Sequence, residues 1–154
     1  MLALNHTLVG AGIGSQIDNI PTVIALSVVS HFVLDFLPHV DPGTEFAEGE
    51  LKPAIKYFLA GIDVFASVFI IVLILLARPG LNQTAVMVGA MTAILMDIIF
   101  NFPLWEKWTK KTRPFSVVSK FHEKIHEPLK RYQYTVGIPL QLIIVIISVW
   151  LLLK

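Results

Sequence analysis

Long apolar stretches alternate with short polar segments along the whole chain. A transmembrane helix needs about 20 predominantly apolar residues, and five stretches approach or reach that length. They lie at residues 2–17, 21–37, 54–77, 84–102 and 136–153. We therefore predict an all-α integral membrane protein, a single membrane domain over residues 1–154 in which about five membrane helices form a bundle.

The first stretch is short and contains Gly10, Gly12 and Gly14. Small residues allow the backbones of two membrane helices to approach each other closely. These glycines therefore predict a packing face, which contacts either a neighbouring helix or a docking partner.

Residues 104–131 follow a different pattern. Eight lysines and arginines are interspersed there with aromatic and aliphatic residues such as Trp105, Trp108 and Phe121. A basic amphipathic helix of this kind lies among the lipid headgroups of a membrane. We expect an interfacial helical segment with membrane lipids as partners. A sharper interpretation is that the segment gathers a phosphate-bearing lipid, and the sequence does not separate the two.

Composition agrees with a membrane protein and narrows the chemistry. Only 15% of the residues are charged, against about 25% in soluble domains. The net charge of +1 gives no reason to expect a nucleic-acid partner. The chain has no cysteine, so a bound metal ion would need nitrogen and oxygen ligands. Zinc is our first expectation for a divalent ion, with manganese, iron or magnesium as alternatives.

The distribution of charge predicts an orientation in the membrane. If the five stretches all cross, ten of the twelve lysines and arginines lie on one side, and only Arg78 and Lys154 lie on the other. The positive-inside rule makes the basic side cytoplasmic. All five histidines and the three aspartates within the apolar stretches then fall in one layer at the cytoplasmic side.

Three candidate metal ligands follow one another at the end of the second stretch, namely His31, Asp35 and His39. Residues four apart lie on one face of a helix, and ligands at this spacing can hold one metal ion. An uncompensated Asp35 would cost on the order of 3 kcal/mol inside a membrane. A divalent cation would offset this cost. The alternative is a hydrogen-bonded polar cluster that fixes helix packing.

Asp63 and Asp97 each stand alone in an apolar stretch without a lysine or arginine within reach. With Asp35 they make three acidic groups and no buried base, which favours a cation among them. Protonated, hydrogen-bonded carboxyl groups are the alternative. A weak internal repeat with an offset of 62 residues aligns Ser30–His39 with Thr92–Asn101, so that Asp97 matches Asp35 and Asn101 matches His39.

The remaining histidines belong to the same predicted layer. His6 begins the first stretch, and His122 and His126 lie four apart in the interfacial segment. Residues 122–126 also spell the short zinc-protease motif His-Glu-x-x-His. Such a match arises easily by chance in a charged amphipathic segment. We therefore interpret these two histidines either as candidate ligands of the same metal or as part of a solvated basic face.

The N-terminal third resembles a known family. Residues 5–11 (Asn-His-Thr-Leu-Val-Gly-Ala) and residues 30–42, with His31-x3-Asp35 followed by Pro38-His39-x-Asp41, resemble small prokaryotic inner-membrane proteins classed as membrane-bound metal-dependent hydrolases (the YdjM-like group). The resemblance implies a multi-pass protein of the prokaryotic inner membrane. It also implies the following site residues: His6, His31, Asp35, His39 and Asp41.

The resemblance is weaker further along the chain. Residues 89–97 are similar to that family's Gly-Ala-x-x-Ala-x-Leu-Pro-Asp-x-Asp, but Met96 replaces the proline and Ile99 replaces the second acid. Beyond residues 1–45 and 85–103 only the hydropathy is similar. The resemblance therefore supports a metal site more directly than it supports a particular reaction.

The expected function is hydrolysis of a lipid-linked ester or phosphoester at the cytoplasmic face. A bound metal would lower the pKa of water toward about 7 and polarise the scissile group, while Asp41 or Asp63 would act as general base. The buried site suits an amphiphilic substrate bearing a phosphate or an ester.

Two non-enzymatic functions remain open at the sequence level. Intramembrane aspartates and histidines also describe a cation- or proton-binding transporter. The outer halves of the helices, however, contain few polar residues besides Ser67, Thr84 and Gln141. They therefore offer no polar route across the membrane. The second alternative is a scaffold in a larger complex, with the glycines as docking faces. The oligomeric state and the number of ions stay open.

Overall fold

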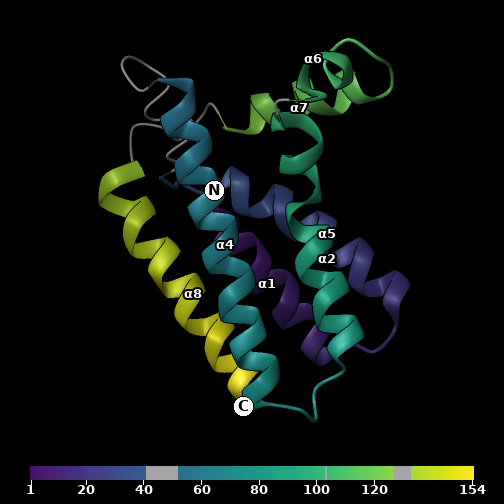
Figure 1. Ribbon diagram of the computed structural model, residues 1–154, viewed down its shortest axis with the longest axis vertical. Helices are drawn as coiled ribbons and strands as arrows, with labels where there is room; N and C mark the ends of the chain where they lie inside the picture. Colours follow the sequence, from purple (N-terminus) through teal and green to yellow (C-terminus); the bar gives the residue numbers. More distant parts are fainter. Residues whose placement is uncertain (41–51, 103, 127–132) are drawn as a thin grey trace.

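The computed structural model describes residues 1–40, 52–102, 104–126 and 133–154, and every regular element in these ranges is a helix (Figure 1). The prediction of an all-α protein is therefore confirmed. The elements in chain order are α1 (Ala3–Gln16), α2 (Ile20–Phe36), α4 (Pro53–Ala77), α5 (Gln83–Asn101), α6 (Glu106–Thr109), α7 (Phe115–His126), the π-helical turn η3 (Gln133–Gly137) and α8 (Ile138–Leu153).

Helix α1 is the central element of the bundle. It packs against α2, α4, α5 and α8, and in Figure 1 it lies behind α4 with α8 on one side and α2 and α5 on the other. Four consecutive residues, from Asn5 to Leu8, are all buried. A helix buried around its whole circumference is surrounded by other helices. The short first stretch therefore forms the core of the bundle.

The glycines of α1 permit its close contact with α5. A Cβ atom on Gly10 would collide with the carbonyl oxygen of Gly89, and one on Gly14 would collide with the carbonyl oxygen of Ala85. This pairing shows that α1 and α5 run antiparallel, with small residues on both sides of the contact. Gly12, in contrast, has no atom within 4 Å of its Cβ position. The predicted packing face thus consists of Gly10 and Gly14.

Helices α2 and α5 run parallel and begin in the same way. Asn19 caps α2 by accepting a hydrogen bond from the Thr22 amide, and Asn82 caps α5 by accepting one from the Ala85 amide. Near their other ends, His31 of α2 contacts the carbonyl oxygen of Ala93 on α5. The start of α1 and the ends of α2 and α5 therefore meet at one end of the bundle, which we call the site-bearing end.

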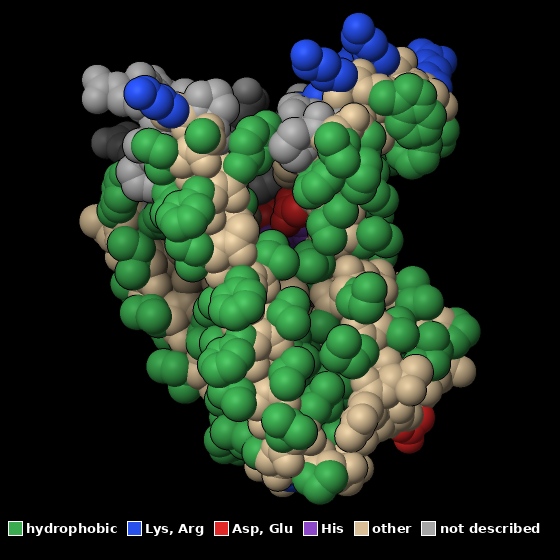
Figure 2. Space-filling view, viewed as in Figure 1, with side chains coloured by type: hydrophobic (Ala, Val, Ile, Leu, Met, Phe, Trp, Pro, Cys, Tyr) green, Lys and Arg blue, Asp and Glu red, His purple; other side chains and the backbone are tan. Residues whose placement is uncertain are grey.

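The outer surface of the bundle is apolar. Three helices are long and apolar enough to cross a membrane, at Tyr57–Ala77, Gln83–Asn101 and Tyr134–Leu153, and Ile20–Phe36 is a shorter apolar helix. Large apolar side chains point outward along them, including Phe65 with 73% and Leu76 with 74% of their surface exposed (Figure 2). A surface this apolar belongs in lipid rather than in water. The chain is a membrane protein, and five crossings stay a prediction.

The basic segment after α5 folds into the short helix α6 and the amphipathic helix α7. Ser119 and His122 of α7 are buried, whereas Lys120 and Lys124 are exposed. The buried side of α7 packs against α2, and Figure 2 shows lysine and arginine side chains gathered over α6 and α7 at one end of the molecule. The helix thus presents its charged face outward while its opposite face covers the site-bearing end.

Candidate metal centre

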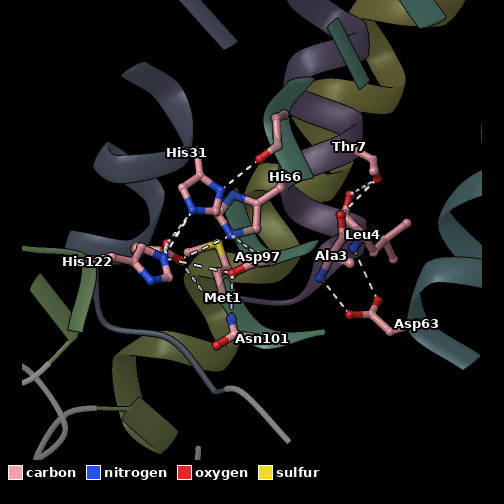
Figure 3. Close-up of polar contacts among 12 residues, drawn as sticks. Met1, Ala3, Leu4, His6, Thr7, His31, Asp63, Asp97, Asn101 and His122 are labelled. Atoms are coloured by element: carbon pink, nitrogen blue, oxygen red, sulfur yellow. Dashed lines mark hydrogen bonds and ion pairs between the residues drawn. The ribbon is translucent and has the colours of Figure 1, made fainter. Parts of the chain in front are cut away.

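Two histidines and two aspartates from three helices converge at the site-bearing end. His31 and Asp35 come from α2, Asp97 from α5 and His122 from α7. Each offers one ligand atom, and these four atoms lie within 4.8 Å of one another. Figure 3 shows His31, His122 and Asp97 turned toward a common centre. Helical spacing predicted the first pair, and the fold brings to it two further candidate ligands of the sequence, Asp97 and His122.

Asp35 is the centre of this group. Its Oδ2 atom lies 2.8 Å from His122 Nε2 and 3.1 Å from His31 Nε2. The two histidine Nε2 atoms are 3.1 Å apart, and His122 Nε2 is 3.8 Å from Asp97 Oδ1. The side chains of His31 and Asp35 are wholly buried, whereas that of Asp97 is 30% exposed. Asp97 therefore forms the accessible side of the group.

The backbone of α5 fixes the orientation and tautomer of His31. The Nδ1 atom of His31 lies 2.7 Å from the carbonyl oxygen of Ala93. A carbonyl oxygen only accepts, so Nδ1 carries the proton and donates it. The neutral ring then has its lone pair on Nε2, the atom that faces Asp35 and His122. A backbone partner of this kind is the usual outer support of a metal-binding histidine.

Aromatic rings hold the imidazole of His122 in place. Phe32 contacts His122 edge to face with 6.1 Å between ring centroids, and the buried Phe100 lies 6.2 Å from it. Phe32 also contacts Phe121, the neighbour of His122 on α7, at 5.7 Å. These contacts join α7 to α2 and α5 and restrict the directions available to the His122 ring.

The donor set fits a divalent transition-metal ion. Ligand atoms bound tetrahedrally at about 2.0–2.2 Å lie about 3.3–3.6 Å apart. The shortest separation given for this group is 2.8 Å, and all four atoms lie within 4.8 Å of one another, so the group brackets that range. Two imidazole nitrogens with two carboxylate oxygens suit zinc, manganese or iron, while magnesium prefers oxygen ligands. The group can therefore hold a metal ion, as expected, without identifying which one.

His6 approaches the two carboxylates from another direction. Its Nε2 atom lies 3.1 Å from Asp35 Oδ1 and 3.9 Å from Asp97 Oδ2, and its ring centroid is 4.4 Å from that of His31. Its Nδ1 atom is buried without a hydrogen-bond partner. The α-ammonium group of Met1 lies 2.8 Å from the same Asp35 oxygen. His6 is thus beside the group of four but contacts different oxygen atoms.

His39 lies outside the group of four. Helix α2 ends at Phe36, and His39 Nδ1 donates to the carbonyl oxygen of Leu37 at 2.7 Å. The backbone of His39 lies against Gly137, where a Cβ atom would come within 2.9 Å of it. Its role as a ligand, expected from the continued spacing of four, stays a prediction.

Gln141 has a role that the sequence did not indicate. Its side-chain amide accepts from the Val40 amide and donates to the Val40 carbonyl, both at 3.0 Å. Gln141 was expected in the outer half of a helix, but this contact places it at the site-bearing end. A lone glutamine in the apolar α8 was the signal for a buried polar partner.

Asp63 receives two backbone groups of α1. Its carboxylate oxygens accept hydrogen bonds from the amides of Ala3 at 2.6 Å and Leu4 at 3.1 Å. The first amides of a helix have no partner within the helix, and Leu2 supplies no side-chain cap. Figure 3 shows Asp63 beside Ala3 and Leu4, apart from the histidines. Asp63 of α4 therefore stabilises the start of the central helix, and its expected role as general base stays a prediction.

Three further candidates complete the sequence-based set. Asn101 is exposed, and its Nδ2 atom donates to Asp97 Oδ1 at 3.4 Å, so it contacts the accessible side of the group. Asp41 and the side chain of His126 lie outside the residues that the structure describes. The His-Glu-x-x-His interpretation and the participation of Asp41 both stay predictions.

Comparisons with protein families, with curated proteins and with solved structures found no match. The resemblance to membrane-bound metal-dependent hydrolases is therefore carried by the sequence motifs alone. The class that the fold and the site define is a helical membrane protein with a buried histidine–aspartate group.

Proposed function

We propose that this protein is a metal-dependent membrane hydrolase that acts on a lipid-linked ester or phosphoester. The observation that carries the proposal is the convergence of His31, Asp35, Asp97 and His122 at the end of an apolar helix bundle. Buried charges at such a place are costly and mark functional sites. The resemblance of residues 1–45 to metal-dependent hydrolases points the same way.

The four side chains would bind the ion and leave one side of it open to the substrate. His31 and His122 present Nε2 atoms to it, and Asp35 supplies the buried negative charge. Asp97 stands at the accessible side, where a substrate group can approach. A divalent ion bound there supplies Lewis-acid activation of water and of the scissile group.

Helix α7 suggests the kind of substrate. It carries the buried His122 and, on its outer face, the exposed Lys120 and Lys124. In Figure 2, acidic and histidine side chains appear in a hollow beneath the end of the molecule where the basic side chains gather. An anionic lipid headgroup attracted by these lysines would therefore lie near the site. This favours an amphiphilic substrate whose scissile group is close to its headgroup.

Of the two carboxylates expected as general base, Asp63 is engaged by two backbone amides. We therefore assign this role to Asp41, which directly follows Val40 in the chain. We further propose five membrane crossings in a prokaryotic inner membrane, with the site-bearing end in the cytoplasm, because the loops at that end contain most of the lysines and arginines.

The proposal is tested by the metal content of the detergent-purified protein. Asp35→Asn keeps the size of the side chain and removes the charge, so we expect the wild-type protein to retain a metal ion and this variant to lose it. Asp18→Asn is the matched control, because Asp18 is exposed and accepts a hydrogen bond from Asn82 at the end of the bundle opposite the site. Hydrolysis of phospholipid and carboxylic-ester substrates is then measured for the metal-loaded protein. Wild-type protein without metal, even after reconstitution, would contradict the proposal.

One observation favours a second candidate, a non-enzymatic membrane protein. Asp35 can satisfy its oxygens with hydrogen bonds from His122, His6 and the Met1 ammonium group. These bonds join α1, α2 and α7 and would stabilise the bundle without a metal ion. A metal-free protein whose thermal stability falls sharply in Asp35→Asn would indicate this structural function.

A further inference from the structure

The two carboxylates of the candidate metal centre each face in two directions. Asp35 directs Oδ2 toward His122 and His31, at 2.8 and 3.1 Å, and Oδ1 toward His6, at 3.1 Å. Asp97 repeats this arrangement, with Oδ1 3.8 Å from His122 and Oδ2 3.9 Å from His6. Each carboxylate therefore lies between His122 on one side and His6 on the other.

Carboxylates placed in this way bridge two metal ions, which lie about 3.5–4 Å apart in two-metal hydrolytic sites. We infer that the site holds two divalent cations, an inference that rests on the proposed metal-dependent function. One cation belongs to His31, His122, Asp35 Oδ2 and Asp97 Oδ1. The other belongs to His6 Nε2, Asp35 Oδ1 and Asp97 Oδ2, and three protein ligands leave room for a substrate atom.

One observation at the His6 side points to a cation there. His6 is wholly buried, and its Nε2 atom faces Asp35 Oδ1 at 3.1 Å. This same oxygen already receives a positive group, the α-ammonium of Met1, at 2.8 Å. A cation in the second position would displace this ammonium group and take over its contact with the carboxylate.

The second cation decides the substrate class. One divalent cation neutralises Asp35 and Asp97, and the neutral imidazoles add no charge. Two divalent cations leave two uncompensated positive charges, so a buried site of low dielectric would bind a doubly charged anion strongly. A phosphomonoester supplies such an anion, whereas a phosphodiester carries one negative charge and a carboxylic ester carries none. The expected substrate is therefore a phosphate-bearing lipid.

The test is a titration of the purified full chain with Mn²⁺, followed by electron paramagnetic resonance. We expect two ions per chain in the wild-type protein and a signal of two magnetically coupled ions. His6→Ala should bind one uncoupled ion, since His31, His122 and one oxygen of each carboxylate remain. Inorganic phosphate should change the spectrum of the wild-type protein and leave that of His6→Ala unchanged.

The outcomes separate this inference from the proposed function. One ion per chain in both proteins would overturn the second cation and leave the hydrolase proposal standing, whereas no ion in either would overturn both. Two coupled ions in His6→Ala would remove His6 from the site. If His6→Ala binds no ion, metal binding is measured for His6→Gln, whose side chain can still donate a hydrogen bond to Asp35. Loss of both ions from His6→Gln, at native melting temperature, would overturn the assignment of His6 to one ion.

Discussion

Asp35 is the residue on which the polar contacts of the site-bearing end converge. It is wholly buried and lies within 3.1 Å of His6, His31 and His122. A carboxylate in this position is stable only when several partners compensate its charge. The chain supplies these partners from α1, α2 and α7, so one side chain connects helices that are far apart in the sequence.

At the residue scale, His31 and His39 give a matched pair for testing the site. Both were expected as ligands, but only His31 lies in the group of four. We predict that His31→Ala lowers metal affinity at least about 10–100-fold, the range typical even for outer partners of metal ligands. His39→Ala should change it little, because His39 Nδ1 donates to the Leu37 carbonyl. Equilibrium metal binding measures both, and equal losses in the two variants would indicate that His39 is also a ligand.

The same pair shows where the sequence pattern is sufficient. His31 and Asp35 lie within one helix, so a spacing of four residues fixes their common face. His39 follows the last helical residue, and its position depends on contacts of the neighbouring backbone with Gln141 and Gly137 more than 95 positions away. Such long-range contacts have no local signature.

At the scale of elements, the contact between α1 and α5 sets the position of His6 relative to Asp97. The two helices approach closely at Gly10 and Gly89, one helical turn from His6 on α1. The glycine content of α1 predicted a packing face. It did not indicate that α1 is the central helix, because a short apolar stretch has the same pattern at the centre of a bundle and at its periphery. Asp63 was equally ambiguous, since the periodicity of α4 does not show which neighbour its carboxylate meets.

Gly10→Ala and Gly12→Ala test this contact as a matched pair on one helix. A methyl group on Gly10 meets the backbone of α5 and lies 2.7 Å from the Ala93 Cβ atom. We predict that it destabilises the protein by about 1–3 kcal/mol, as overpacking does. The methyl group on Gly12 enters open space, and alanine favours the helix by up to about 1 kcal/mol. Unfolding in detergent measures both, and similar stability of the two variants would contradict the close contact.

At the scale of the whole molecule, the functional groups are concentrated at one end. The opposite end is held by simpler contacts, such as the hydrogen bond of 2.8 Å between Asn82 and Asp18 and the contact of Arg78 with the Leu153 carbonyl. The charge distribution and helix alternation predict one polar layer. Three of the histidines in the described part of the chain, His6, His31 and His122, do come together, whereas His39 lies outside their group. The orientation of this end in a cell stays a prediction.

The absence of native cysteines makes this orientation measurable. Gly80→Cys lies in the turn between α4 and α5, where nothing is within 4 Å of its Cβ position, and Lys111→Cys is exposed near α6. We predict that a membrane-impermeant maleimide labels Gly80→Cys in intact cells and labels Lys111→Cys only after lysis. Labelling of both from outside would contradict the assignment of the basic segment to the cytoplasm.

The convergence of side chains from α1, α2, α5 and α7 also sets an order in time. His6, His31 and Asp35 leave the ribosome early, but the group of four is complete only after residue 122 of 154 has been made. A nascent chain that has inserted its first helices therefore carries half of the binding group and lacks the residue that closes it. Under the proposed function, stable capture of an ion follows synthesis of α7, so metal loading would be a late step of biogenesis and would report that α2, α5 and α7 have come together.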